Sequence, residues 1–172
     1  MRNRLETERL ILRPFELKDA EDMFYGWASD DEVTQYLTWN SHKTIETTLD
    51  IINLWIEQYE KPERINFAIE LKENKKVIGG IDVVGYIDGV PVIGYNLSKK
   101  YWNYGYMTEA CKKVIEHLFS IGHNVIRIDA LVDNVASNKV IKKCGGVYQE
   151  TYEETFTQKN KIVQINRYLI NK

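Results

Sequence analysis

The sequence predicts an α+β fold with one mixed, mostly antiparallel sheet flanked by helices. Apolar residues alternate strictly through residues 65–72, which is the pattern of a half-buried strand. Two further apolar runs follow, joined by a hairpin turn at Asp88 and Gly89. A strand, a helix and a strand then follow over residues 90–132, so those two strands should be parallel with a right-handed crossover.

The N-terminal half is expected to contain one strand and two main helices. Residues 9–15 alternate as a first strand, and Asp19 is the expected N-cap of the helix that follows. That helix places four apolar side chains on one face: Ala20, Met23, Phe24 and Trp27. A short helical turn is expected at residues 31–36. The clearest helix of this half carries Ile45, Leu49, Ile52, Ile56 and Tyr59, and Pro62 lies just past its end.

The rest of the chain alternates strands and helices and closes with a hairpin. The expected strands cover residues 65–72, 77–84, 90–98, 125–132, 147–156 and 162–170. An apolar stripe over residues 110–119 predicts a helix that Gly122 ends, and a short helix is expected at residues 137–144. The expected order is β-α-α-β-β-β-α-β-α-β-β, in a single domain over residues 1–172.

The composition is that of an ordinary globular protein. The chain has 172 residues, 44 % hydrophobic and 28 % charged, and a net charge of −2, which gives no basic field for nucleic acid or an anionic membrane. No apolar run approaches the roughly 18 residues of a membrane span, and the N-terminus lacks the apolar stretch of a signal peptide. Cys111 and Cys144 match no metal or redox spacing and read as reduced core residues. We therefore expect a cytoplasmic protein without a metal.

The segment YWNYGYMTEA, residues 101–110, places a single glycine, Gly105, in a loop between a buried strand and a helix. Such a loop aims free N–H groups and the positive end of the helix dipole at one spot, which suits a phosphate. Gly105 would let the ligand approach without a Cβ in the way. The spacing alone is weak evidence, because it matches neither a P-loop nor GxGxxG, and a plain strand-to-helix connection is the alternative.

The segments LETERLILRPF, IGYNLSKKYWNYGYMTEA and DNVASNKVIKKCG, with the element order, resemble the GNAT superfamily of acetyl-CoA-dependent N-acyltransferases. The resemblance runs over residues 5–170 and is nearest to the RimJ/RimL type, which includes acetyltransferases of ribosomal-protein N-termini. It implies that backbone N–H groups hold the pyrophosphate of acetyl-CoA, from Asn103, Tyr104, Gly105, Tyr106, Met107 and Thr108.

The family's phosphate loop reads Q/R-x-x-G-x-G/A, and this chain departs from it at the ends. Trp102 occupies the first position, Met107 the last, and Asn103 stands where the RimJ/RimL group often has a second glycine. The Met107 side chain would either narrow the approach of the pyrophosphate or pack into the helix. Lys99 and Lys100 either assist with phosphates or are solvated lysines.

The resemblance also implies where the thioester lies. The pantetheine arm should pair with the strand that ends YNLS, and the backbone of Leu97 should meet the acetyl carbonyl. Asn134 matches the residue that holds the pantetheine, and Ser137 matches the hydroxyl beside the thiol. A strand-end turn and a helix N-cap are the local alternative, because Asn and Ser are favoured there.

The base is harder to choose. Asp82 lies within the apolar run VIGGIDVVG, where an unpaired carboxylate is costly and burial would raise its pKa toward that of a base. The alternative is that Asp82 faces solvent. Further candidates are the carboxylates of Glu150, Glu153 and Glu154, with Tyr148 and Tyr152 as alternative acids. Trp39 either joins the core or lines an acceptor pocket.

We therefore expect an N-acetyltransferase in which a primary amine, on a protein N-terminus or a small molecule, attacks acetyl-CoA in a ternary complex. The rival is a non-catalytic CoA-sensing or partner-binding module on the same fold. Met107 and the unclear base favour the rival, whereas Gly105, Asn134 and Ser137 favour the enzyme. The β-branched strand at residues 162–170 would invite edge pairing, so a homodimer is also expected.

Overall fold

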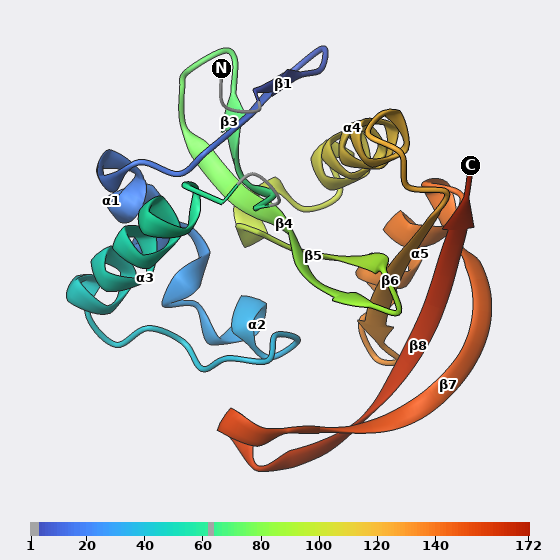
Figure 1. Cartoon of the computed structure of the whole chain (residues 1–172). Helices are drawn as coiled ribbons and strands as arrows, with labels where there is room; N and C mark the ends of the chain where they lie inside the picture. Colours follow the sequence, from blue (N-terminus) through green and yellow to red (C-terminus); the bar gives the residue numbers. More distant parts are fainter. Residues whose placement is uncertain (1–3, 62–63) are drawn as a thin grey trace.

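The computed structural model describes residues 4–61 and 64–172, which form one sheet flanked by helices (Figure 1). The strand order is β1-β2-β3-β4-β5-β6-β8-β7, and all neighbours are antiparallel except the parallel pair β5 and β6. The strands are Leu5–Glu6 (β1), Leu10–Arg13 (β2), Asn66–Leu71 (β3), Val77–Ile87 (β4), Val90–Leu97 (β5), Val125–Leu131 (β6), Val147–Phe156 (β7) and Lys161–Asn171 (β8). The predicted α+β class and the parallel crossover are confirmed.

The helices cover both faces of this sheet. They are Ala20–Met23 (α1), Asp31–Thr34 (α2), Ile45–Gln58 (α3), Tyr106–Ser120 (α4) and Val135–Lys143 (α5). Figure 1 shows α1, α2 and α3 on one side of the central strands and α4 and α5 on the other. The expected helix end at Pro62 lies outside the described residues. No helix within the two described ranges is long and apolar enough to cross a membrane.

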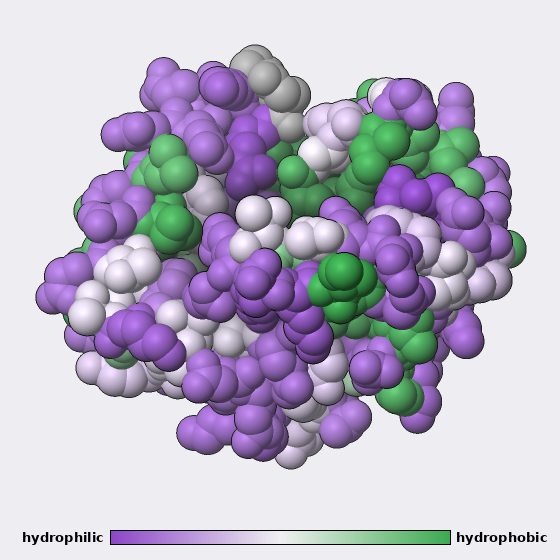
Figure 2. All heavy atoms as spheres, turned by 90° about the horizontal axis from the view of Figure 1, so that it is seen from below, coloured by the Kyte–Doolittle hydropathy of each residue, from purple (hydrophilic) through white to green (hydrophobic). Residues whose placement is uncertain are grey.

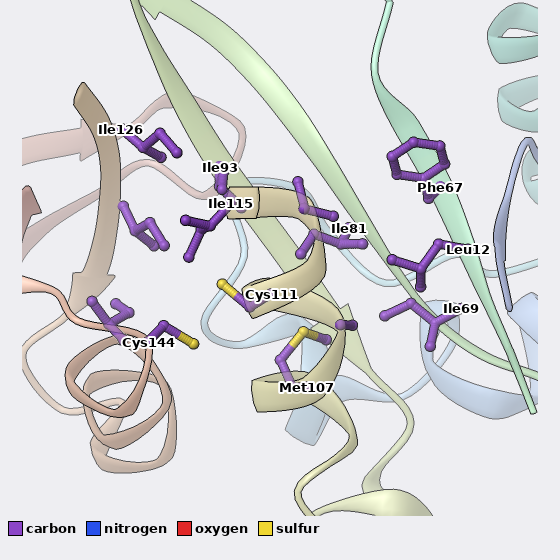
Figure 3. Close-up of a cluster of buried hydrophobic side chains, with 14 of the residues drawn as sticks. Leu12, Phe67, Ile69, Ile81, Ile93, Met107, Cys111, Ile115, Ile126 and Cys144 are labelled. Atoms are coloured by element: carbon purple, nitrogen blue, oxygen red, sulfur yellow. The ribbon is translucent and has the colours of Figure 1, made fainter. Parts of the chain in front are cut away.

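The larger hydrophobic core lies between the sheet and α4. Leu12, Ile81, Met107 and Cys111 point into it (Figure 3), and the stripe predicted for α4 is fully buried at Ala110, Cys111, Val114 and Leu118. The helix stops where expected, since Gly122 follows it in a left-handed conformation with φ of 109°. A second core cluster, which contains Trp27 and Ile52, packs under α1 and α3.

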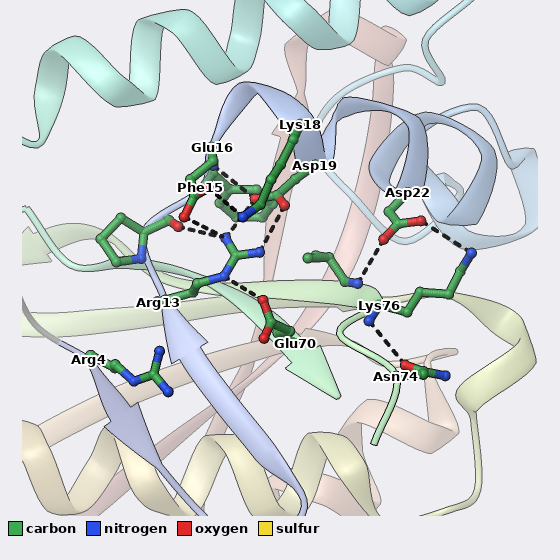
Figure 4. A network of polar contacts seen from close by, with 12 residues as sticks. Arg4, Arg13, Phe15, Glu16, Lys18, Asp19, Asp22, Glu70, Asn74 and Lys76 are labelled. Atoms are coloured by element: carbon green, nitrogen blue, oxygen red, sulfur yellow. Dashed lines mark hydrogen bonds and ion pairs between the residues drawn. The ribbon is translucent and has the colours of Figure 1, made fainter. Parts of the chain in front are cut away.

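Asp19 occupies the N-cap position of α1, as predicted, but its side chain makes no capping bond to that helix. Its carboxylate instead accepts two hydrogen bonds from the buried Arg13 guanidinium, at 2.8 and 2.9 Å, and one from the Glu16 amide at 2.8 Å (Figure 4). Arg13 also donates to Glu70 at 2.6 Å. A buried guanidinium needs carboxylate partners, so this ion pair takes the oxygen atoms that a cap would use.

The end of the chain also differs from the prediction. β8 is not a sheet edge, because it pairs with β6 from Val125↔Asn171 to Leu131↔Ile165 and with β7 on its other side. The edge strand of this hairpin is therefore β7, which is almost wholly exposed. The face seen in Figure 2 is mostly hydrophilic, and its hydrophobic side chains form separate groups.

The parallel pairing between β5 and β6 is short. Its register holds Val92↔Arg127 and Ile93↔Ile128, and within the described chain no pairing joins the two strands beyond Ile93. β5 nevertheless continues to Leu97, paired with β4 on its other side. An opening therefore forms in the middle of the sheet.

Candidate active site

A pocket of about 450 Å³ lies at the opening between β5 and β6. Asp82 and Tyr95 both line it, although they come from opposite faces of the sheet. Tyr95 packs against the core under α4, whereas Asp82 lies between Ile81 and Val83, which face that core, so its side chain points to the other face. The pocket therefore passes through the sheet.

Ser137 and Asn134 line the pocket from the start of α5. The helix begins at Val135, two residues earlier than predicted, because the Asn134 side-chain oxygen accepts from the Ser137 amide at 3.1 Å and forms the N-cap. Asn134 therefore has the role of a helix N-cap, which was the alternative to a functional role. That role does not describe Ser137, whose Oγ lies 2.9 Å from the phenol oxygen of Tyr95.

Asp82 does not face bulk solvent. Its side chain is 25 % exposed, and one carboxylate oxygen lies 3.5 Å from Nη2 of Arg64. Burial raises the pKa of Asp82 to about 6, and the nearby Arg64 charge lowers it only in part. Gly94 on β5 leaves room here, since a Cβ on it would lie 3.6 Å from the carboxylate oxygen and 2.6 Å from Val84 Cγ1.

The remaining carboxylate candidates differ in their surroundings. Glu150 forms an ion pair with Arg167, and Glu153 accepts a hydrogen bond from Gln164 at 2.9 Å. Glu154 lines the pocket.

Neither of the two predicted tyrosines is bonded to Ser137, although Tyr152 lines the same pocket. The Tyr148 hydroxyl lies 2.8 Å from Thr151 Oγ1 on the exposed strand β7. The Tyr152 hydroxyl donates to Asp129 at 3.0 Å and accepts from Arg127 at 2.9 Å. Burial, with the Asp129 charge, raises the pKa of Tyr152 to about 12. Trp39 lines the pocket, which was one of the two positions that the sequence allowed for it.

The loop before α4 contains two left-handed residues and leads into helix amides without a helical acceptor. Asn103 and Gly105 have φ values of 66° and 80°, so both residues are left-handed, and glycine is the residue that adopts this conformation without strain. The first helical hydrogen bond runs from the Glu109 amide to the Gly105 carbonyl at 3.0 Å. The amides of Tyr106, Met107 and Thr108 precede it and have no helical acceptor.

The Met107 side chain does not cover the backbone of this loop. That side chain is 6 % exposed and belongs to the core, so it packs into the helix side and does not narrow the approach (Figure 3). The Trp102 indole donates to the Leu97 carbonyl at 2.8 Å and ties the loop to the end of β5. Lys99 forms an ion pair with Glu32.

The first turn of α4 is tied to the turn between β1 and β2. Glu109 accepts from the Thr7 hydroxyl at 2.6 Å, from the Arg9 amide at 2.9 Å and from Arg9 Nε at 2.7 Å. Arg9 also donates to the Tyr104 carbonyl at 3.0 Å and lies over the Tyr106 ring. We name Thr7, Arg9 and Glu109 the loop brace.

The structure brings Asp82, Asn134 and Ser137 into one pocket. Leu97, at the end of β5, and the loop residues that follow this strand do not line it. Sequence reasoning missed Tyr95 and Arg64. Tyr95 had a signal, because it alternates inward with Ile93 and Leu97 and a buried phenol needs a partner. Arg64 had none, since no pattern relates it to Asp82.

The sheet opens between two parallel strands, a loop with left-handed residues follows the first of them, and a carboxyl and a hydroxyl group lie at the opening. The acetyltransferase (GNAT) domain family matches residues 9–147. The chain is also 33 % identical over 144 residues to the uncharacterized N-acetyltransferase YoaA of Bacillus subtilis (strain 168), covering 82 % of this chain and 81 % of that one. The chain belongs to the GNAT acetyltransferase family and is an acyltransferase, so the predicted family is confirmed.

Solved structures share the fold. RimL, a ribosomal L7/L12 alpha-N-protein acetyltransferase in complex with coenzyme A, superposes with a TM-score of 0.86 at 16 % identity, covering 98 % of each chain. The microcin C7 self-immunity acetyltransferase MccE, in complex with acetyl-CoA and AMP, has a TM-score of 0.84 at 19 % identity, covering 96 % of this chain and 94 % of that one. The fold is thus RimL-like.

Proposed function

We propose that this protein transfers the acetyl group of acetyl-CoA to a primary amine that attacks the thioester directly. The observation that carries the proposal is the pocket through the sheet, because it joins a carboxylate of raised pKa, Asp82, to a hydroxyl, Ser137. Direct transfer requires an acceptor for the amine proton and a donor for the departing sulfur. The two groups supply these roles from opposite faces of the sheet.

Acetyl-CoA would lie along β5, with its pyrophosphate on the backbone amides of the loop before α4. The left-handed residues Asn103 and Gly105 and the unpaired first-turn amides support this position. The Ser98 amide donates to the Ile78 carbonyl at 2.8 Å, toward β4, so alternation turns the Leu97 amide to the open edge of β5. There it could polarise the thioester carbonyl. The complexes of RimL with coenzyme A and of MccE with acetyl-CoA support the choice of co-substrate.

The reaction forms a C–N bond and breaks the C–S bond of the thioester. Asp82 accepts the proton that the amine nitrogen loses, and Ser137 Oγ gives its proton to the sulfur. Asp82 then releases its proton and Ser137 regains one by exchange with solvent as the products leave, so the net change is one proton moved from nitrogen to sulfur. The Asn134 side-chain oxygen is used by the Ser137 amide, which leaves its NH₂ group for the pantetheine arm. No metal takes part in these steps.

The acceptor is a protein N-terminus or a small-molecule amine. Asp82 and Glu154 place carboxylates in the pocket, and these would attract an ammonium group before it loses its proton. The name of RimL supports an N-terminal acceptor. We further propose a cytoplasmic protein, since both cysteines are free and buried, and a homodimer that pairs through the β7 edge.

Release of free CoA from acetyl-CoA tests the function. We would measure it against a panel of N-terminal peptides, polyamines and other primary amines, and identify acetylated products by mass spectrometry. Ser137→Ala should lower kcat about 10²-fold, as expected for the loss of a proton donor. CoA binding measured by calorimetry, without turnover of any amine, would instead identify a CoA-sensing module.

A further inference from the structure

One hydrogen bond spans the opening in the sheet on the side of α4 and α5. β5 and β6 stop pairing at Ile93↔Ile128, and Tyr95 is the next residue of β5 that points to the α4 side. Its phenol oxygen reaches across the opening to Ser137 Oγ at 2.9 Å and lies 3.4 Å from the Ser137 carbonyl. Both residues line the pocket.

The direction of this bond decides what Ser137 can do. Burial raises the pKa of Tyr95 far above that of a free phenol, so its hydroxyl keeps its proton. A protonated phenol can donate to Ser137 Oγ. A serine hydroxyl has only one proton, and when Oγ accepts from Tyr95 that proton is free to point at another acceptor in the pocket.

No other tyrosine in the described part of the chain is bonded to this hydroxyl. Tyr148 is bonded to Thr151, and Tyr152 to Asp129 and Arg127. Ser137 is 9 % exposed, so water has little access to replace a lost partner. The orientation of the Ser137 hydroxyl therefore depends on Tyr95.

We infer that Tyr95 is a positioning residue, which donates to Ser137 Oγ and so directs the serine proton at the sulfur of the departing thiol. This inference rests on the proposed function and adds to it a residue that acts through Ser137. Tyr95 itself gains and loses no proton. The C–N bond forms and the C–S bond breaks as in the proposed reaction, and the sulfur receives the proton of Ser137 Oγ.

Removal of the phenol oxygen alone tests the inference. Tyr95→Phe keeps the ring in the core, and we expect kcat to fall about tenfold, part of the 10²- to 10⁴-fold that general acid catalysis contributes. The KM for acetyl-CoA should change by less than about twofold, because the proposed phosphate contacts lie in the loop before α4. A purely structural role would not separate kcat from KM in this way.

A matched control comes from the same helix. The Tyr168 hydroxyl donates to Asn138 Oδ1 at 2.7 Å, so Tyr168→Phe removes a buried phenol oxygen that contacts α5 one residue beyond Ser137. We expect this variant to lose as much thermal stability as Tyr95→Phe and to keep its kcat. Equal loss of kcat in both variants would mean that loosening α5 explains the effect and would overturn the inference.

A double-mutant cycle completes the test. If Tyr95 acts through Ser137, Tyr95→Phe should have no further effect on kcat in the Ser137→Ala protein. A full additional loss in that background, or unchanged kcat in Tyr95→Phe, would refute the inference while leaving acetyl transfer in place. Full activity of Ser137→Ala would refute it equally. Absence of amine acetylation by the unmodified protein would refute the proposed function itself.

Discussion

The pKa of Asp82 predicts that the activity falls at acidic pH, which gives the pH profile of kcat/KM a measurable acidic limb. With a pKa of about 6, about 90 % of this carboxyl is ionised at pH 7 and about 10 % at pH 5. Since only the carboxylate can accept the amine proton, kcat/KM should fall about tenfold from pH 7 to pH 5. A weakly basic aromatic amine is the suitable acceptor, because it stays neutral across the range and adds no titration of its own.

Arg64 allows the assignment of this limb to Asp82. The Arg64 charge and hydrogen bond lower the pKa of Asp82 against the larger effect of burial. Arg64→Gln should therefore raise that pKa further and move the limb to higher pH, so that activity at pH 7 falls and recovers as the pH rises. Lys76→Gln is the matched control, because it removes a cation beside β4 that pairs with Asp22 and not with Asp82.

The same pKa predicts a cost in stability. The folded pKa lies above the unfolded value of 3.8, so the folded state loses stability as the pH rises from about 4 to 6 and carries the full cost above 6. Asp82→Asn should thus abolish the limb, lower kcat, and raise the free energy of unfolding at pH 7 by about 2–3 kcal/mol. Denaturant titration measures this change. A limb that persists in Asp82→Asn, or stays in place in Arg64→Gln, would refute the assignment of the base.

Three further predictions concern the loop before α4 and the sheet edge. Gly105→Glu should abolish CoA binding in calorimetry, because it adds a side chain and a charge at a left-handed residue of the proposed anion site. Asn tolerates that conformation, so Gly105→Asn should bind CoA more tightly than Gly105→Glu does. Unchanged CoA affinity in Gly105→Glu would contradict the loop assignment. Glu109→Gln should raise the KM for acetyl-CoA and lower the melting temperature, while Glu116→Gln on the exposed side of α4 should do neither. Burial opposes ionisation of Glu109, but the bonds from Thr7 and Arg9 outweigh it and lower its pKa, so this stabilisation should be present above pH 4.5 and be lost as the pH falls below it. Light scattering at micromolar concentration should give the mass of a dimer, and a monomer would count against pairing through β7.

The fold could be predicted from the sequence where one periodicity controlled a whole element. The stripe on α4 corresponds to the observed burial, and Gly122 ends α4 as expected. The alternation of residues 65–72 predicted the strand β3 but not its burial, because β3 is buried on both faces and not on one. The differences have separate causes. The position of β8 inside the sheet depends on its pairing with β6, which is distant in the sequence. The Asp19 carboxylate is bonded to the buried Arg13, and α5 starts early because Asn134 caps it, so in both places one of several local options was taken.

The site was predictable to the same extent. Ser137 and Asn134 could be located from the resemblance, and Asp82 from a carboxyl group in an apolar strand, and all three line the pocket. The sequence did not show which side chains these residues contact. The contacts of Asp82 with Arg64, and of Ser137 with Tyr95, join strands to a loop and a helix far along the chain. The loop brace was equally hidden, since Arg9 and Glu109 are 100 residues apart.

The costly features of this structure are concentrated along β5. Parallel pairing with β6 stops after Ile93, the neighbouring Asp82 is held in a setting that raises its pKa, and the loop that follows β5 contains two left-handed residues, Asn103 and Gly105. Each feature lowers stability relative to a regular strand, turn or exposed carboxylate. A chain selected for stability alone would remove these costs, for example by continuing the ladder or replacing Asp82 with an apolar residue. Their occurrence together along one strand is what a site for an extended ligand and a proton acceptor requires.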